Sequence, residues 1–357
     1  MTHPTLPSSI GQLLREGTVI PAHPLALTKE RTLDEKRQKL LTQYYMASGA
    51  GGVAVGVHTT QFEIRKPEVN LLEPVLRMAS EQIRDSDPGR PFIKVAGIVG
   101  PTPQALREAE LAVKHGYHLG LVSMGGLHDQ RESDLIKRLA AVAEIIPVFG
   151  FYLQPAVGGR LLSYDFWKDA ASIPNLYAIK VAAFNRYQTL DVVRAVCASP
   201  RHDDIALYTG NDDNIVADLL TTYRFDVDGK QIEKKFVGGL LGHWAVWTGA
   251  AVKLLHSIKQ SGNDNGVVSE LLSVGIKVTD MNAAIFDSAN AFHGCIPGIH
   301  EVLRRQGLLE GTWCLNPEER LSAGQLDEIN RVCEAYPGLT DDEQVKHFLE
   351  KAFSHPY

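Results

Sequence analysis

Short apolar runs rich in β-branched residues alternate along this chain with segments whose apolar positions recur at helical spacing. Eight such runs occur, at 18–27, 52–57, 92–99, 118–124, 148–154, 177–183, 206–210 and 236–243. A strand followed by a helix, repeated along the chain, predicts βαβ units around a parallel sheet. Eight strands favour a closed (β/α)8 barrel over an open doubly wound sheet, which usually has about five or six.

Local signals mark the ends of individual elements. Thr102 is placed to cap a helix, Pro103 occupies its first position, and Gly116 suits its end. Between the seventh and eighth runs, the segment 225–232 surrounds Asp228-Gly229, a dipeptide typical of tight hairpin turns. We therefore expect a helix near 102–116 and a small inserted hairpin.

The strand pattern stops near residue 245, and helical periodicity continues to the end of the chain. It is interrupted at 261–266 and by expected turns near Pro297 and Pro317. The expected fold class is therefore α/β, a (β/α)8 TIM barrel with a C-terminal helical extension. We place the barrel at 15–245 and the helical region, packed on the barrel, at 246–357.

Composition and charge narrow the class of partner. The chain is 44% hydrophobic and 22% charged, as in ordinary globular proteins, and its formal net charge of -6, without a run of Lys or Arg, argues against nucleic acid. No stretch approaches the ~20 apolar residues that span a bilayer, and the first residues do not read as an export signal. The 4 cysteines are far apart, which suits a reducing compartment. We expect a cytoplasmic protein that handles small molecules.

A lysine is the first candidate for chemistry. In a strand at 177–183, side chains alternate, so Ala178, Lys180 and Ala182 are expected to face the barrel interior. Burial of an ammonium without a partner lowers its pKa and produces the neutral amine that attacks a carbonyl. The alternative is a lysine at a strand end that reaches solvent.

A tyrosine on the preceding strand is the second candidate. Gly150, Tyr152 and Gln154 share one parity, and we expect them to face inward, which would bring Tyr152 beside Lys180. A phenol next to an amine can move protons while an imine forms. The alternative is a core aromatic residue with a hydrogen bond.

The loop ends of the barrel supply further candidates. In the segment 56–61, the hydroxyls of Thr59 and Thr60 could hold a substrate carboxylate, or could merely start a helix. Specificity is expected from side chains at the carboxyl ends of the strands. These are His58, Met124, His128, Arg160, Phe184, Asn185, Asn211 and His243. A structural role is the alternative for His58 and His243, and helix capping is the alternative for Asn211, Asp212 and Asp213.

Together these residues resemble the dihydrodipicolinate synthase and N-acetylneuraminate lyase family of class I aldolases. The run Tyr152-Leu-Gln-Pro155 is similar to the family's Tyr-Asn-x-Pro, and Ile179-Lys180 to its Ile-Lys. The segments 56–61 and 209–212 are imperfect echoes of its Gly-Thr-Thr-Gly-Glu and Ser-Gly-Asp-Asp motifs. The resemblance covers roughly residues 15 to 260. It implies a barrel with a Schiff-base lysine, assembled as a homotetramer or homodimer.

The sequence also departs from that family. Ser123-Met-Gly-Gly126 stands where dihydrodipicolinate synthase has a relay tyrosine, Arg160 is the nearest match to a displaced arginine, and the glutamate of the second strand is out of register. These differences argue against lysine biosynthesis. They favour cleavage or dehydration of a hydroxylated 2-keto acid.

The expected function is that of a carbon–carbon or carbon–oxygen lyase with Schiff-base chemistry. Its partner would be a 2-keto acid such as pyruvate or a sugar-acid derivative, and neither a cofactor nor a metal is expected. One alternative is a metal-dependent aldolase or hydrolase barrel, with His58, His243 and Asp212 as ligands. The other is a barrel that binds a ligand without catalysis.

Overall fold

The computed structural model describes residues 4–262 and 264–354 of the 357-residue chain. The chain forms two compact units. The first unit is Met1–Thr18 with Ile93–Leu240, and the second is Val19–Phe92 with Leu241–Tyr357. The predicted division into 15–245 and 246–357 remains a prediction.

The expected barrel strands are all present. They are β1 (Val19–Pro21), β2 (Gly52–Val55), β3 (Ile93–Ile98), β4 (Leu119–Val122), β5 (Val148–Leu153), β6 (Leu176–Ala182), β7 (Ala206–Thr209) and β10 (Phe236–Leu241). Their order in the sheet is β1-β10-β7-β6-β5-β4-β3-β2, and a parallel bridge between Ala22 and Ala54 joins the two ends of that order. The fold is a (β/α)8 TIM barrel with additional C-terminal helices, which confirms the predicted fold class.

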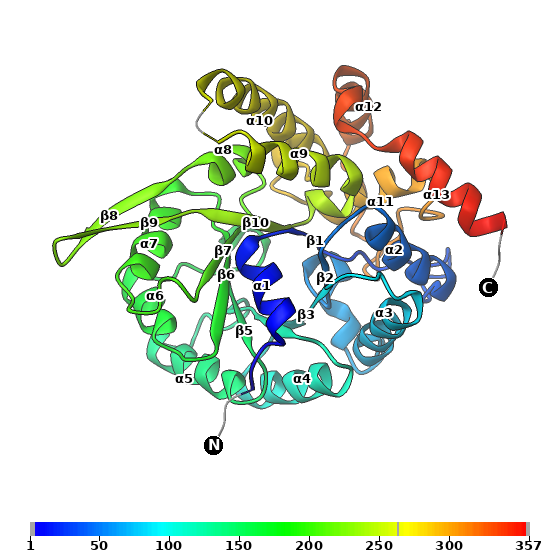
Figure 1. Ribbon diagram of the computed structural model, residues 1–357. Helices are drawn as coiled ribbons and strands as arrows, with labels where there is room; N and C mark the ends of the chain where they lie inside the picture. Colours follow the sequence, from blue (N-terminus) through cyan, green and yellow to red (C-terminus); the bar gives the residue numbers. More distant parts are fainter. Residues whose placement is uncertain (1–3, 263, 355–357) are drawn as a thin grey trace. The chain divides into compact units, whose positions relative to one another are not determined.

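Amphipathic helices follow the strands of the first unit. They are α1 (Ser8–Glu16), α4 (Thr102–Lys114), α5 (Glu132–Ala143), α6 (Tyr164–Ala171), α7 (Arg186–Cys197) and α8 (Ile215–Leu220), with a 3-10 turn η3 (Pro155–Val157). Helices α4 to α7 lie side by side along the outside of β3 to β7 (Figure 1). Strand β5 is buried at every position because it is covered on both faces.

The start of α4 corrects one local expectation. Thr102 is the first helical residue and does not cap the helix; the N-cap is Pro101, and Pro103 therefore lies one position later than predicted. Gly116 does end this segment, with a φ of 69° and a bond from its N–H to the carbonyl of Val113. A left-handed residue of this kind is the usual reason for glycine after a helix.

The inserted hairpin is confirmed and lies in the first unit. It consists of β8 (Tyr223–Val227) and β9 (Lys230–Lys234), paired antiparallel (Figure 1). Asp228 and Gly229 both have positive φ, at 52° and 74°. That geometry is the one that Asp-Gly favours in two-residue hairpin turns.

The second unit contains β1 and β2 and the remaining helices. The α-helices are α2 (Glu35–Ala47), α3 (Leu72–Ser86), α9 (Thr248–Gln260), α10 (Asn265–Ile285), α11 (Cys295–Arg305), α12 (Gln325–Ala335) and α13 (Asp342–Ser354). The 3-10 turns are η1 (His58–Thr60), η2 (Phe62–Arg65), η4 (His243–Ala245), η5 (Ser288–Asn290) and η6 (Pro337–Leu339). Helical structure after residue 245 is thus confirmed. A turn at 291–294 precedes α11, as expected near Pro297, and Pro297 itself lies in the first turn of that helix, where its missing N–H costs no helical hydrogen bond.

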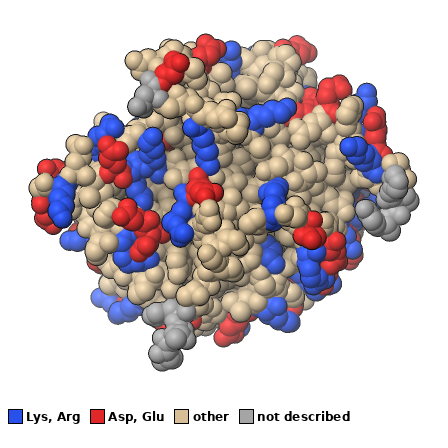
Figure 2. Space-filling view, in the orientation of Figure 1, with Lys and Arg blue, Asp and Glu red and all other residues tan. Residues whose placement is uncertain are grey.

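The surface carries charges of both signs. Lys and Arg alternate with Asp and Glu over the face drawn in Figure 2, without a large patch of one sign. Among the residues that the structure describes, no helix is long and apolar enough to span a bilayer.

Candidate active site

The pairing of β5, β6 and β7 decides which side chains share a face with Lys180. In the parallel ladders, Lys180 is the register partner of Phe151 on β5 and of Tyr208 on β7. Register partners project from the same face of a sheet. The Nζ atom of Lys180 accordingly lies 4.4 Å from the centre of the Phe151 ring. Lys180 therefore points to the interior face, as the alternation predicts.

The glycine that directly follows β7 makes room for the lysine stem. A Cβ added to Gly210 would lie 2.5 Å from Cε of Lys180 and 2.9 Å from Cβ of Ala182. Distances this short are not tolerated, so only glycine allows the stem to lie against β7. The lysine is 9% exposed, and its amine is confined among Phe151, Gly210 and the following loop.

Burial makes this amine reactive. Loss of solvation lowers the pKa of Lys180 to about 8, while the carboxylate of Asp212 acts in the opposite direction and raises it. At neutral pH, a group with this pKa is uncharged in roughly one molecule in ten, against less than about one in a thousand for an ordinary lysine. A neutral amine is the form that attacks carbonyl carbon.

Tyr152 faces the opposite way from the prediction. Its register partner is Val181; its ring stacks on Trp167 of α6, with centroids 5.5 Å apart. Its hydroxyl exchanges hydrogen bonds with the main chain of Leu162, at 3.3 and 3.4 Å. The expectation that Tyr152 points into the barrel beside Lys180 is therefore wrong.

The cause is an irregularity in the pairing of β5 with β6. Val148 pairs with Leu176, but Phe149 pairs with Ala178, so Tyr177 is skipped. Without that extra residue, Tyr152 would be opposite Lys180. A shift of one residue turns every later side chain to the other face, and Phe151 therefore takes the place expected for Tyr152.

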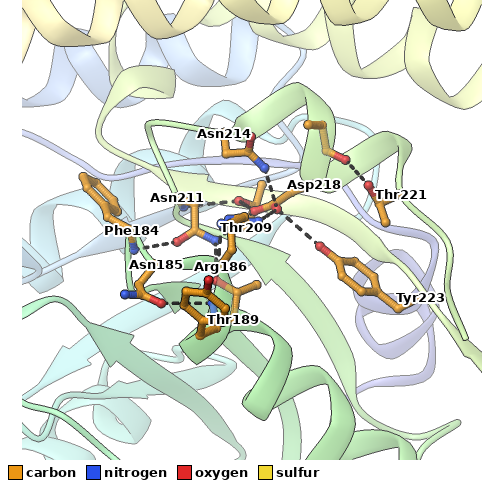
Figure 3. A network of polar contacts seen from close by, with 12 residues as sticks. Phe184, Asn185, Arg186, Thr189, Thr209, Asn211, Asn214, Asp218, Thr221 and Tyr223 are labelled. Atoms are coloured by element: carbon orange, nitrogen blue, oxygen red, sulfur yellow. Dashed lines mark hydrogen bonds and ion pairs between the residues drawn. The ribbon is translucent and has the colours of Figure 1, made fainter. Parts of the chain in front are cut away.

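Asn211 belongs to a polar network on the helix side of β7, drawn in Figure 3. Its amide nitrogen donates to Asp218 on α8 at 2.9 Å, and its amide oxygen accepts a bond from the N–H of Phe184 at 3.0 Å. The N-cap of α8 is Asn214, not Asn211. Asn211 thus ties the loop after β6 to the loop after β7, and helix capping is not its role.

Asp218 is the centre of this network and is fully buried. It forms an ion pair with Arg186 and accepts hydrogen bonds from Thr209 at 2.7 Å and from Asn214 at 3.1 Å, in addition to the bond from Asn211 (Figure 3). The hydroxyl of Tyr223, on the inserted hairpin, lies 3.4 Å away. A buried carboxylate with this many donors fixes the loops that provide them.

The other expected residues of the first unit have structural contacts. Arg160 donates to the carbonyls of Leu127 and Gln130, at 2.5 and 3.0 Å, and so holds the loop after β4. Asn185 caps α7 through the N–H of Tyr187 at 2.9 Å. Met124 is buried and His128 is exposed. Binding of substrate by Arg160 or Asn185 would compete with these bonds.

The hydroxyls of Thr59 and Thr60, in the second unit, donate to main-chain carbonyls of another segment of that unit. Thr59 donates to the carbonyl of Ala22 at 2.8 Å, and Thr60 donates to that of His23 at 2.7 Å. A hydroxyl has one hydrogen to give, so these bonds use both donors. Thr59 and Thr60 thus fasten the loop after β2 to the segment that follows β1, and the expected contact with a substrate carboxylate stays a prediction.

The two histidines differ in exposure. His58 is partly exposed, and its ring lies 5.9 Å from that of Phe62. His243 is buried, and burial lowers its pKa to about 4 against the opposing hydrogen bond to Asn282. His243 is thus neutral at physiological pH, which fits the structural alternative.

The comparisons with known proteins concern the fold. No protein-family model matches the chain, and no curated protein matches it in sequence. Solved structures do match. Dihydrodipicolinate synthase from Oceanobacillus iheyensis is 16% identical with a TM-score of 0.71, over 92% of this chain and 99% of that one. The chain has the fold of the dihydrodipicolinate synthases and N-acetylneuraminate lyases.

Two further structures of this fold hold a small acid. N-acetylneuraminate lyase from Fusobacterium nucleatum, complexed with pyruvate, is 16% identical with a TM-score of 0.68, over 90% of this chain and 98% of that one. The chloride-inhibited dihydrodipicolinate synthase from Acinetobacter baumannii, complexed with pyruvate, is 16% identical with a TM-score of 0.71, over 89% and 98%. At this level of sequence identity, the structural similarity confirms the fold that the sequence resemblance implies.

The alternative of a metal-dependent barrel requires side chains that are grouped to bind a metal ion. Residues 4–262 and 264–354 contain no group of three or more His, Cys, Asp or Glu side chains placed to hold a metal ion.

The burial of Asp218 has a recognisable signal in the sequence. Ile215-Val-Ala-Asp-Leu-Leu220 places one carboxylate in an otherwise apolar helix. A charge in such a run is buried and must find partners. The position of Phe151 beside Lys180 has no such sequence signal, because it depends on the pairing irregularity at Tyr177.

Proposed function

We propose that this protein is a lyase that forms a Schiff base between Lys180 and a 2-keto acid. The observation that carries the proposal is the buried amine of Lys180, held against Phe151 and Gly210 with its pKa lowered to about 8. Amines of this kind are the nucleophiles of imine-forming enzymes. The pyruvate in two proteins of the same fold supports a 2-keto acid as the substrate class.

The chemistry follows from the imine. Lys180 attacks the ketone carbon, water leaves, and a protonated C=N bond remains. This group attracts electrons and stabilises the enamine that forms when a neighbouring bond breaks or forms. Aldol cleavage, aldol condensation and dehydration all use such an intermediate. Among them, cleavage or dehydration of a hydroxylated 2-keto acid is our proposal.

Trapping with borohydride tests this proposal. The protein is incubated with pyruvate and borohydride, which reduces an imine to a stable amine, and its peptides are then examined by mass spectrometry. We expect the adduct on Lys180. Lys234 is the internal control, because burial also lowers its pKa, yet its amine donates to the carbonyl of His202. Its peptide should remain unmodified.

Two results would overturn the proposal. One is the absence of an adduct on Lys180 with pyruvate and with several larger 2-keto acids. The other is equal labelling of Lys180 and Lys234, which would show nonspecific reaction with accessible amines.

A further inference from the structure

Imine formation at Lys180 needs a group that moves protons, and Tyr152 does not face the lysine. Tyr208 is the phenol opposite Lys180 on β7. It is fully buried, and its hydroxyl already donates to the carbonyl of Leu14 at 2.9 Å. Burial also raises its pKa well above the usual value. Tyr208 therefore serves the packing of α1 and is a poor proton donor or acceptor for the lysine.

The residues that follow β7 identify another group. The N–H of Gly210 bonds to the carbonyl of Val181 at 2.7 Å, so the ladder with β6 continues one residue beyond the strand. Gly210 lies against Lys180, whereas Thr209 and Asn211, on either side, bond to Asp218 on the helix side. The chain then turns, because the N–H of Asp212 bonds to the carbonyl of Gly210 at 3.1 Å, and this turn keeps Asp212, whose Oδ1 is buried, next to the residue that lies against Lys180.

The network around Asn211 holds that position. Asn211 is bonded to Phe184, Thr189 and Asp218 (Figure 3). The main chain before Asp212 is therefore fixed relative to the loop after β6. Independently of this turn geometry, the charge of Asp212 acts on Lys180 and opposes the effect of burial on its pKa.

We propose that the carboxylate of Asp212 transfers protons to and from the nitrogen of Lys180 while the imine forms and breaks down. This inference rests on the proposed Schiff-base function. It assigns to Asp212 the proton-transfer role that we expected of Tyr152 from its predicted position beside Lys180. The role differs from helix capping and from metal binding, the two uses considered for this residue from sequence.

The proton count balances. Asp212 accepts one proton from the Lys180 ammonium, and the neutral amine attacks the ketone carbon; the C–N bond forms as the carbonyl electron pair moves to oxygen. Asp212 gives its proton to that oxygen, takes a second proton from the new C–NH2+ group, and passes it to the hydroxyl. Water leaves, and the nitrogen lone pair forms the C=N bond. The net change is one ammonium and one ketone to one protonated imine and one water.

The test compares adduct formation in Asp212→Asn, Asp213→Asn and the unaltered protein, with pyruvate and borohydride at pH 7. The two roles that Asp212 could have, electrostatic neighbour and proton-transfer group, predict opposite changes in the rate of adduct formation in Asp212→Asn. Removal of the Asp212 charge lowers the pKa of Lys180 further, so a mere electrostatic neighbour would leave the rate unchanged or raise it. Loss of proton transfer should slow adduct formation by about 100-fold. Asp213→Asn makes the same chemical change one residue later and should change the rate by less than about threefold.

Two further variants keep the inference testable if Asp212→Asn folds poorly. Asp212→Glu keeps a carboxylate and should retain the rate to within about tenfold, and added formate should accelerate Asp212→Ala. Failure of both results would overturn the inference, as would an unslowed Asp212→Asn or an equally slow Asp213→Asn. Absence of an adduct in the unaltered protein would instead overturn the proposed function, so the two failures are distinguishable.

Discussion

Two buried ionisable side chains lie on opposite sides of strands β5 to β7. Lys180 is on the interior face, and Asp218 is on the face that the helices cover. Asp218 accepts hydrogen bonds from strands β7 and β8 and from two asparagines of the loop after β7, and Arg186 at the start of α7 supplies the opposite charge. Lys180 lies against an aromatic ring and a glycine, and one carboxylate, Asp212, acts on it from the following loop. Both groups are buried, but their surroundings differ completely.

This difference separates a structural charge from a reactive one. Fixed donors satisfy the oxygens of the buried Asp218 carboxylate, so this side chain orders the loops that bond to it. Burial without such partners destabilises the ionised form of an amine and lowers the pKa of Lys180, which is the property that our proposal uses. Perturbation of a buried group therefore indicates chemistry only where its charge is left poorly compensated.

The largest expected effect comes from loss of the amine. Lys180→Ala should reduce turnover of a 2-keto acid substrate by on the order of 10³-fold or more, because no other group supplies the covalent intermediate. Lys234→Ala should leave turnover within about threefold. Steady-state kinetics of both variants measure this difference. Full activity in Lys180→Ala would show that Lys180 is not the group that reacts with the substrate.

Loss of the structural charge should mainly reduce stability. Asp218→Ala leaves Arg186, Asn211 and Thr209 without their shared acceptor, at an expected cost of about 3 kcal/mol in the free energy of unfolding. Asp203→Ala is the control; that side chain is 93% exposed, and its loss should change the same free energy by less than about 0.5 kcal/mol. Urea unfolding measures both, and equal stability of the two variants would refute the structural assignment of Asp218.

The rate of adduct formation should depend on pH in a defined direction. The neutral amine reacts, and it prevails above the pKa of Lys180, which is lowered to about 8. Between pH 7 and pH 9 the rate of trapping should therefore rise by about tenfold and then level off. A rate that keeps rising to pH 10 or beyond would show a lysine with an ordinary pKa and would remove the basis of the comparison.

The smallest effect is expected at Tyr152. Because its hydroxyl bonds to Leu162 on the helix side, Tyr152→Phe should cost about 1 kcal/mol of stability and should leave adduct formation within about threefold. Borohydride trapping of this variant measures the rate. A loss of about 100-fold would instead show that the phenol acts on Lys180 and that the faces have been assigned the wrong way round.

Much of the fold could be predicted because its signals are local. Apolar β-branched runs identified every barrel strand, and Asp228-Gly229 identified the hairpin turn. The inward direction of Lys180 was also predictable, since alternation within one strand determines it. Thr102 shows the limit of such signals, because a cap and a first helical residue differ by a single position.

The site was less predictable because it depends on relations between distant segments. The face of Tyr152 is set by the pairing irregularity at Tyr177, which the periodicity of either strand does not reveal. The hydroxyls of Thr59 and Thr60 bond to carbonyls of Ala22 and His23, far away in sequence, so their availability could not be judged from the motif. Asp212 becomes a candidate only when Gly210 is seen to lie against Lys180.

The central claim is that Lys180 forms a covalent imine with a 2-keto acid. A crystal structure of the protein after reaction with pyruvate and borohydride tests it most directly. We predict continuous electron density from Nζ of Lys180 to the C2 carbon of the acid, with a carboxylate oxygen of Asp212 at hydrogen-bonding distance from that nitrogen. An unmodified Lys180 at full occupancy, in crystals of protein treated with pyruvate and borohydride to completion, would contradict the account.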